Sequence, residues 1–162
     1  MWLVVCGCGA APGDGNGRLT AHLRYATRDS VRFETPASLR RCGGARGFVL
    51  EGELRGNGVL VWLRKGGDSL PPGRYPVLLR GDTLTPRGAV VAVRFMTGEM
   101  AHGLVLDSGW VTVTVGGGKE PSVSAAVRGA GLEPTAGRRV AVEAEFTKTG
   151  LAADSARCEA RL

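Results

Sequence analysis

The chain of 162 residues carries a net charge of +6 and is long enough for one domain with a substantial hydrophobic core. Apolar residues make up 43% of it and aromatic residues only 6%, so we expect a core built mostly from Val, Leu and Ala. Its 26 Gly and 8 Pro residues follow no collagen-like period and separate alternating apolar runs, which indicates turns rather than disorder. The few Ala-rich stretches are short and interrupted, so long helices are not expected.

Positive charge is concentrated in the first half of the chain. Residues 18–80 hold twelve Arg and Lys against five Asp and Glu, whereas residues 81–162 hold nine of each. A basic surface can attract anionic lipid, an acidic protein or nucleic acid, although an Arg-rich solvated strand face has the same composition. Nucleic acid is the least favoured partner, because only Tyr25 and Phe33 interleave with the arginines and no known nucleic-acid-binding signature is present.

Residues 1–17 begin apolar and become rich in small residues after Cys8. The run Val5-Cys6-Gly7-Cys8 resembles a bacterial lipobox, and the residues behind it resemble the flexible tether of an exported lipoprotein. This resemblance implies a lipid on Cys8 in preference to Cys6, because Gly7 is the small residue expected before the lipidated cysteine. Only five residues precede Cys6 and none is positively charged, whereas a signal peptide has an apolar region of about 7–15 residues. A truncated start and a short buried N-terminus are the two alternatives.

A single β domain is expected over residues 18–162, and it opens with two strands. In residues 18–25 the apolar side chains alternate with polar ones, as in a strand with one buried and one solvated face. His22 falls on the polar face, where no second ligand at a suitable spacing supports a metal site. Residues 30–34 form a short second strand that ends before Pro36.

The next two strands, residues 47–54 and 58–64, flank a hairpin turn. Asn57-Gly58 is the turn signal, because both central positions of the favoured turn need positive φ. Trp62 lies in an otherwise apolar strand and is expected in the core, with an exposed sugar-stacking Trp as the alternative. Residues 74–79 are expected at a sheet edge or to enter the sheet after Pro76, because Pro76 has no N–H to donate.

The second half of the chain reads as a series of strands. Residues 88–96 are nearly all apolar, which predicts a central strand covered on both faces. The irregular segment 96–103 is expected to be a plain connection, with a functional loop as the alternative. Residues 109–147 contain three runs separated by Gly-rich breaks and predict an antiparallel meander. Residues 156–162 are expected to form a terminal edge strand.

These patterns predict an all-β fold, a mostly antiparallel sandwich or flattened barrel of about eight to ten strands. The runs 109–115, 122–128 and 140–146, followed by Cys158, resemble the small β-rich domains of exported bacterial envelope lipoproteins. That resemblance implies no catalytic residues.

Two cysteines remain in the body of the chain once Cys6 and Cys8 are assigned to the lipobox-like segment. In a protein that resembles an exported one, Cys42 and Cys158 are expected to form a disulfide. Closing so long a loop contributes at most roughly 5 kcal/mol in the chain-entropy model. A zinc site on Cys6 and Cys8 is the rival use, but two ligands do not complete a tetrahedral set.

No enzyme and no cofactor are indicated by the sequence. It lacks a nucleophile elbow, a zinc-protease His pair and a phosphate-binding loop. The carboxylate pairs Glu51/Glu53 and Glu143/Glu145 each lie on one strand face, where solvation is the default and acid–base chemistry would need a cleft.

The expected function is therefore that of a non-catalytic, membrane-tethered protein in a bacterial envelope, periplasmic or at the outer surface. We expect it to dock as an accessory or structural subunit on a membrane protein complex or another envelope protein. The alternative is a small-ligand or glycan carrier, in which Trp62, Tyr75 and Trp110 would contact the ligand. The candidate docking residues form the basic first half of the chain: Arg18, Arg24, Arg28, Arg32, Arg40, Arg41 and Arg46.

Overall fold

The computed structural model describes residues 17–43, 47–65, 68–117 and 122–158. These residues form ten β-strands and no helix, which confirms the all-β prediction. The lipobox-like segment with Cys6 and Cys8, and also Arg46, lie outside the described residues. The strands are β1 (Arg18–Tyr25), β2 (Ser30–Pro36), β3 (Ser38–Gly43), β4 (Gly47–Leu54), β5 (Asn57–Arg64), β6 (Gly73–Pro76), β7 (Gly88–Thr97), β8 (Met100–Gly116), β9 (Ser122–Glu133) and β10 (Arg138–Arg157).

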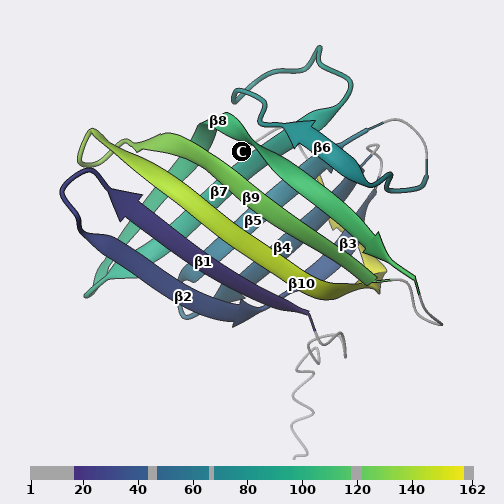
Figure 1. Cartoon of the computed structure of the whole chain (residues 1–162), viewed down its shortest axis with the longest axis horizontal. Coiled ribbons are helices and arrows are strands. Elements are labelled where there is room, and N and C mark those ends of the chain that lie inside the picture. The colour runs from purple at the N-terminus through teal and green to yellow at the C-terminus, as the bar shows by residue number, and fades with distance from the viewer. Residues whose placement is uncertain (1–16, 44–46, 66–67, 118–121, 159–162) are drawn as a thin grey trace, which may run out of the picture.

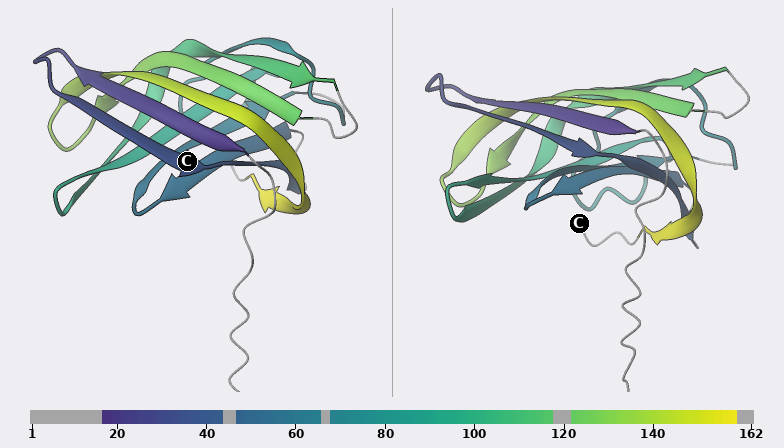
Figure 2. Two further views of the ribbon diagram at one scale, coloured as in Figure 1. Left: turned by 60° about the horizontal axis from the view of Figure 1, so that its bottom comes forward. Right: turned by 90° about the horizontal axis from the view of Figure 1, so that it is seen from below.

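All ten strands belong to one hydrogen-bonded sheet that is folded into two layers. The order along it is β2-β1-β10-β3-β4-β5-β7-β8-β6, and β9 lies between β10 and β8. The pairing of these strands is antiparallel except between β10 and β3. Figures 1 and 2 show β2, β1, β10, β9 and β8 in one layer, here called the front layer, and β3, β4, β5 and β7 in the other, the back layer. The result is a flattened sandwich and not a closed barrel.

Two long strands pass from one layer to the other. The first part of β8 pairs with β7 and its later part with β9, with a register shift between Leu106 and Ser108. Likewise, β10 pairs with β1 up to Thr147 and with β9 up to Gly150, with a register shift between Phe146 and Thr149, and from Leu151 onward it pairs with β3. A β-bulge bends a strand and increases its twist, which lets one strand form a corner between stacked sheets.

The core lies between the layers and consists mainly of Val, Leu and Ala, as the composition predicts. Strand alternation explains it: the alternate residues Leu19 and Leu23 of β1, and Val61 and Leu63 of β5, are fully buried and belong to the same core cluster. Each such side chain contributes about 1.5–3 kcal/mol when it is removed from water. The interior also holds the ring of Phe95.

Several local predictions are confirmed. The strand β1 has the predicted bounds, and β7 is central, between β5 and β8. The strand β6 ends at Pro76 and pairs with β8 alone among the described strands, so it is an edge. The plain connection predicted within 96–103 is a tight turn at Gly98 and Glu99, with Gly98 at a φ of 61°, and the rest of that segment belongs to β7 and β8.

Other local predictions were wrong. The β4–β5 turn is centred on Arg55 and Gly56, which have φ of 52° and 81°, so Asn57 and Gly58 already belong to β5. Trp62 is half-buried on the outer face of β5, because Val59, Val61 and Leu63 take the inward positions. Only part of β7 is covered on both faces, since Arg94 is exposed. The predicted terminal strand does not start separately at residue 156, because β10 continues to Arg157; residues 159–162 of that prediction lie outside the described residues.

Candidate functional site

The outer face of the front layer carries a row of polar side chains that crosses four strands. The register places Arg32 of β2 beside His22 of β1, His22 beside Glu143 of β10, and Glu143 beside Arg128 of β9. Trp110 of β8 follows Arg128 and is 39% exposed. The β alternation that buries Leu23 and Val142 turns this row toward solvent.

Two ion pairs meet at Glu143, one of them with Arg128 of the polar row and the other with Arg24 of β1. Arg24 approaches Glu143 at 2.5 Å, and Arg128 approaches the same carboxylate oxygen at 3.4 Å. Exposed pairs of this kind contribute only about 0–1 kcal/mol each, so they can be exchanged for contacts with a partner at low cost.

A groove of about 520 Å³ lies on the same face. Its floor includes the small residue Ala126, and charged or polar side chains surround it on neighbouring strands. Those that line it include His22, Arg32, Glu34, Arg128, Glu143 and Glu145. Arginine and glutamate side chains thus both line this depression, which suits it to polar contacts with a second surface.

The predicted basic surface is divided between the two layers. Arg18, Arg24 and Arg32 lie on the front layer and Arg28 lies in the β1–β2 turn, whereas Arg40 and Arg41 belong to β3 in the back layer. Much of this charge is also neutralised by acidic residues on adjacent strands. The side chain of Arg18 pairs with Glu34 at 3.1 Å, and Arg40 pairs with Glu51 and, at 3.4 Å, with Asp154.

The three aromatic residues predicted for ligand contact are not brought together. Tyr75 points into the core, where it is fully buried and donates a hydrogen bond to the Pro71 carbonyl at 2.7 Å. Trp110 lies on the outer face of the front layer, with the Arg74 guanidinium 3.9 Å from its ring centre. Trp62 lies on the outer face of the other layer. A carrier site formed by all three is therefore incompatible with the fold.

Cys42 and Cys158 form a disulfide, in agreement with the sequence prediction. The bridge joins β3 to the residue after β10, across a separation of 116 residues. It therefore holds the parallel β10–β3 pair at the corner where β10 enters the back layer.

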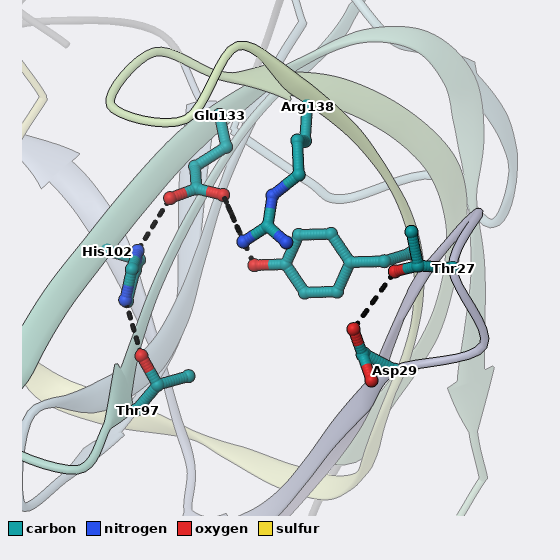
Figure 3. A network of polar contacts seen from close by, with 7 residues as sticks. Thr27, Asp29, Thr97, His102, Glu133 and Arg138 are labelled. Carbon is teal, nitrogen blue, oxygen red and sulfur yellow. Dashed lines mark hydrogen bonds and ion pairs between the residues drawn. The ribbon is translucent and has the colours of Figure 1, made fainter.

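Sequence reasoning missed a buried polar network at one end of the sandwich. Glu133, at the end of β9, is fully buried, and its Oε1 lies 2.5 Å from Nδ1 of His102 near the start of β8. Its other oxygen accepts a hydrogen bond of 3.2 Å from the Tyr25 hydroxyl at the end of β1. Figure 3 shows the Glu133 carboxylate directed at His102, with Arg138 beside it. The carboxylate therefore joins three strands.

The remaining neighbours complete this network. The hydroxyl of Thr97 lies 2.5 Å from His102 Nε2, and the ring of Phe95 stacks on the imidazole with centroids 5.1 Å apart. The Arg138 guanidinium lies 3.8 Å from Glu133 and covers the Tyr25 ring at 4.4 Å. Burial, and then the negative charge of Glu133, raise the pKa of Tyr25 above its usual value.

Thr97, His102 and Glu133 form a series of hydroxyl, imidazole and carboxylate, each in contact with the next. Enzymes with a catalytic triad use the same series to activate a nucleophile. They also satisfy a buried carboxylate, which is costly to leave unpaired. His102 stood out in the sequence as one of two His residues, in an irregular segment. Glu133 gave no signal, because it precedes a Pro and resembles the start of a loop.

Comparison of the chain with protein-family models, curated proteins and solved structures finds no match. Within the described parts of the chain, no helix is long and apolar enough to cross a membrane. Over the same ranges, His, Cys, Asp and Glu form no group of three or more that could hold a metal ion.

Proposed function

We propose that the protein is an exported, membrane-tethered, non-catalytic binding domain that docks on an envelope partner through the outer face of its front layer. The observation that carries this proposal is the exposed row from Arg32 to Trp110 beside a groove of about 520 Å³. Arginine and tryptophan are the residue types that most often dominate the affinity of protein interfaces. This docking surface replaces the predicted set of seven arginines, because five of them, Arg18, Arg24, Arg32, Arg40 and Arg41, are divided between the two layers.

Two features support an exported and tethered location. A disulfide persists in oxidising compartments and is rare in the bacterial cytoplasm, and Cys42 and Cys158 lie in bonding geometry. The sequence before β1 resembles a lipobox, and a cysteine that carries several acyl chains holds a protein firmly on a bilayer. On this proposal the domain works at a membrane surface, where tethering raises its local concentration near a membrane partner.

The docking face is tested by crosslinking and pull-down of the tagged full chain from its native membrane. Arg128→Glu reverses a charge in the row and should lower recovery of the partner at least about tenfold, as loss of an interface hot spot does. Arg94→Glu is the matched control, because it makes the same change at an exposed position of β7 in the back layer. Equal recovery with both variants, or equal loss, would contradict docking through the front layer.

A second candidate function is acyl transfer by Thr97, favoured by its contact with His102 and by the contact of His102 with Glu133. We rank it below docking because Thr97 lines neither the groove of the front layer nor the groove on the outer face of β4, β5 and β7. Hydrolysis of an activated ester should fall to background in Thr97→Ala if this function holds. Thr112→Ala, at another exposed threonine, is the control. Unchanged hydrolysis in both variants removes the acyl-transfer candidate.

A further inference from the structure

The strand β2 lies at an edge of the sheet. Among the described strands, β2 pairs with β1 alone. The Ala37 amide donates to the Gly17 carbonyl at 2.9 Å, and the Tyr25 amide to the Asp29 carbonyl at 3.0 Å. Hydrogen-bonded and non-hydrogen-bonded positions alternate along an antiparallel pair. The odd-numbered residues of β2 therefore bond to β1, and Ser30, Arg32 and Glu34 direct their backbone groups away from it.

We propose that the protein forms a two-fold symmetric dimer in which β2 pairs antiparallel with β2 of a second copy. In this arrangement the front layer continues across the dimer axis as one sheet, a form of edge pairing common in recognition. The interface is the same strand on both copies, as a two-fold axis requires. The dimer requires no docking partner, although Arg32 and Glu34 also line the groove on the front layer.

The charge pattern of β2 favours a register centred on Phe33 over the two neighbouring registers. Arg32 and Glu34 are exposed on the same face, two residues apart, with Phe33 between them. A pairing centred on Phe33 places Arg32 opposite Glu34 of the second copy, and Glu34 opposite its Arg32. Shifting the centre to Arg32 or to Glu34 would place like charges opposite each other, which destabilises a cross-strand pair.

The backbone groups fit the same register. With Phe33 on the axis, the outward amide of Arg32 meets the outward carbonyl of Glu34 in the second copy, and the reverse pair forms by symmetry. Ser30 faces Pro36, which has no N–H, so the missing donor falls at the end of the interface. Charges on an edge strand usually oppose pairing, but here the two opposite charges make the strand complementary to itself.

The inner face of β2 adds apolar contacts. Val31 and Phe33 are half-buried and pack against the core from the front layer. In the proposed register Phe33 lies directly beside Phe33 of the second copy, in the non-hydrogen-bonded position where side chains approach most closely. The half-exposed edge of each core is thereby covered by the other.

The test is sedimentation velocity of the full chain in mild detergent over a range of concentrations. Arg32→Glu and Glu34→Arg each create like-charge pairs across the axis and should weaken the dimer about tenfold or more. The double variant with both changes restores opposite charges and should regain the dimer, while Arg94→Glu should leave it unchanged. Recovery in the double variant also shows that the single variants did not fail by misfolding.

Amide hydrogen exchange gives a second readout. The amides of Arg32 and Glu34 should become slower to exchange as the protein concentration rises, because only the second copy protects them. A monomer at every concentration would overturn the proposal. It would also be overturned by single variants that dimerise as the wild type does, or by a double variant that stays monomeric.

Discussion

His102 Nδ1 lies 2.5 Å from Glu133 Oε1, and this contact joins the start of β8 to the end of β9 inside the sandwich. Glu133 is fully buried and His102 is 7% exposed. The other carboxylate oxygen of Glu133 accepts a hydrogen bond from the hydroxyl of Tyr25. The network therefore links β1, β8 and β9, whose residues are far apart in the sequence. Its first consequence concerns stability.

Glu133→Ala should lower the free energy of unfolding by about 3–5 kcal/mol, because it removes one partner of a buried polar pair and leaves the others unsatisfied. Glu143→Ala, an exposed carboxylate on the front layer, should cost less than about 1 kcal/mol. Urea unfolding of both variants measures the difference. Equal costs would mean that the buried network contributes no more than a surface ion pair.

Both tyrosines of the chain should titrate above the ordinary range. Burial is the first cause of the raised pKa of Tyr25 and of Tyr75. The unfolded chain loses these protons first, so their contribution to stability is complete below the ordinary pKa of about 10 and declines as pH rises through the folded pKa. Absorbance of tyrosinate should therefore appear at higher pH in folded than in urea-unfolded protein. In Tyr25→Phe only Tyr75 titrates, so the variant assigns each titration to its residue. Coincident titration curves for folded and unfolded protein would contradict the burial of the two tyrosine side chains.

Gly109 has a φ of 116° beside the β8 bulge, and a Cβ there would collide with the Arg128 carbonyl. Gly109→Ala should cost about 1–3 kcal/mol, because L-residues avoid this conformation. Gly150→Ala is the control, since its added Cβ meets no neighbour and its φ is not in the positive range. Thermal unfolding that is equally shifted in both variants would argue against the corner in β8.

Reduction of the Cys42–Cys158 bridge should destabilise the domain by about 2–5 kcal/mol, the usual range for a native disulfide in a small exported domain. Cys42→Ser should reproduce the effect and should abolish any further effect of reductant. The free energy of unfolding in urea is measured for wild type and variant, each with and without reductant. If reductant destabilised the Cys42→Ser variant as much as the wild type, the destabilisation would not come from the Cys42–Cys158 bridge.

The strands were predictable where one face alternates cleanly, as in Leu19 and Leu23 of β1, because a half-buried strand imposes that period. The strand β3 was not predicted, since Leu39 is its only fully buried apolar side chain and an isolated apolar residue sets no period. Trp62 lies in a run that is apolar on both faces, so the sequence could not distinguish its outward position.

The site was less accessible to sequence reasoning than the strands. The disulfide followed from the number of cysteines and the resemblance to exported proteins. By contrast, His102 and Glu133 are separated by 31 residues, and Tyr25 and Glu133 by 108. Only the sheet register brings such residues together, and register is a property of pairing that one sequence does not display.

The most direct test of the account is the intact mass of the chain recovered from its native membrane, measured before and after reduction. An exported, tethered domain predicts added acyl mass on Cys8 and a gain of two hydrogens on reduction of Cys42–Cys158. A chain without lipid and with both body cysteines already reduced would contradict the proposed location, and with it docking on an envelope partner.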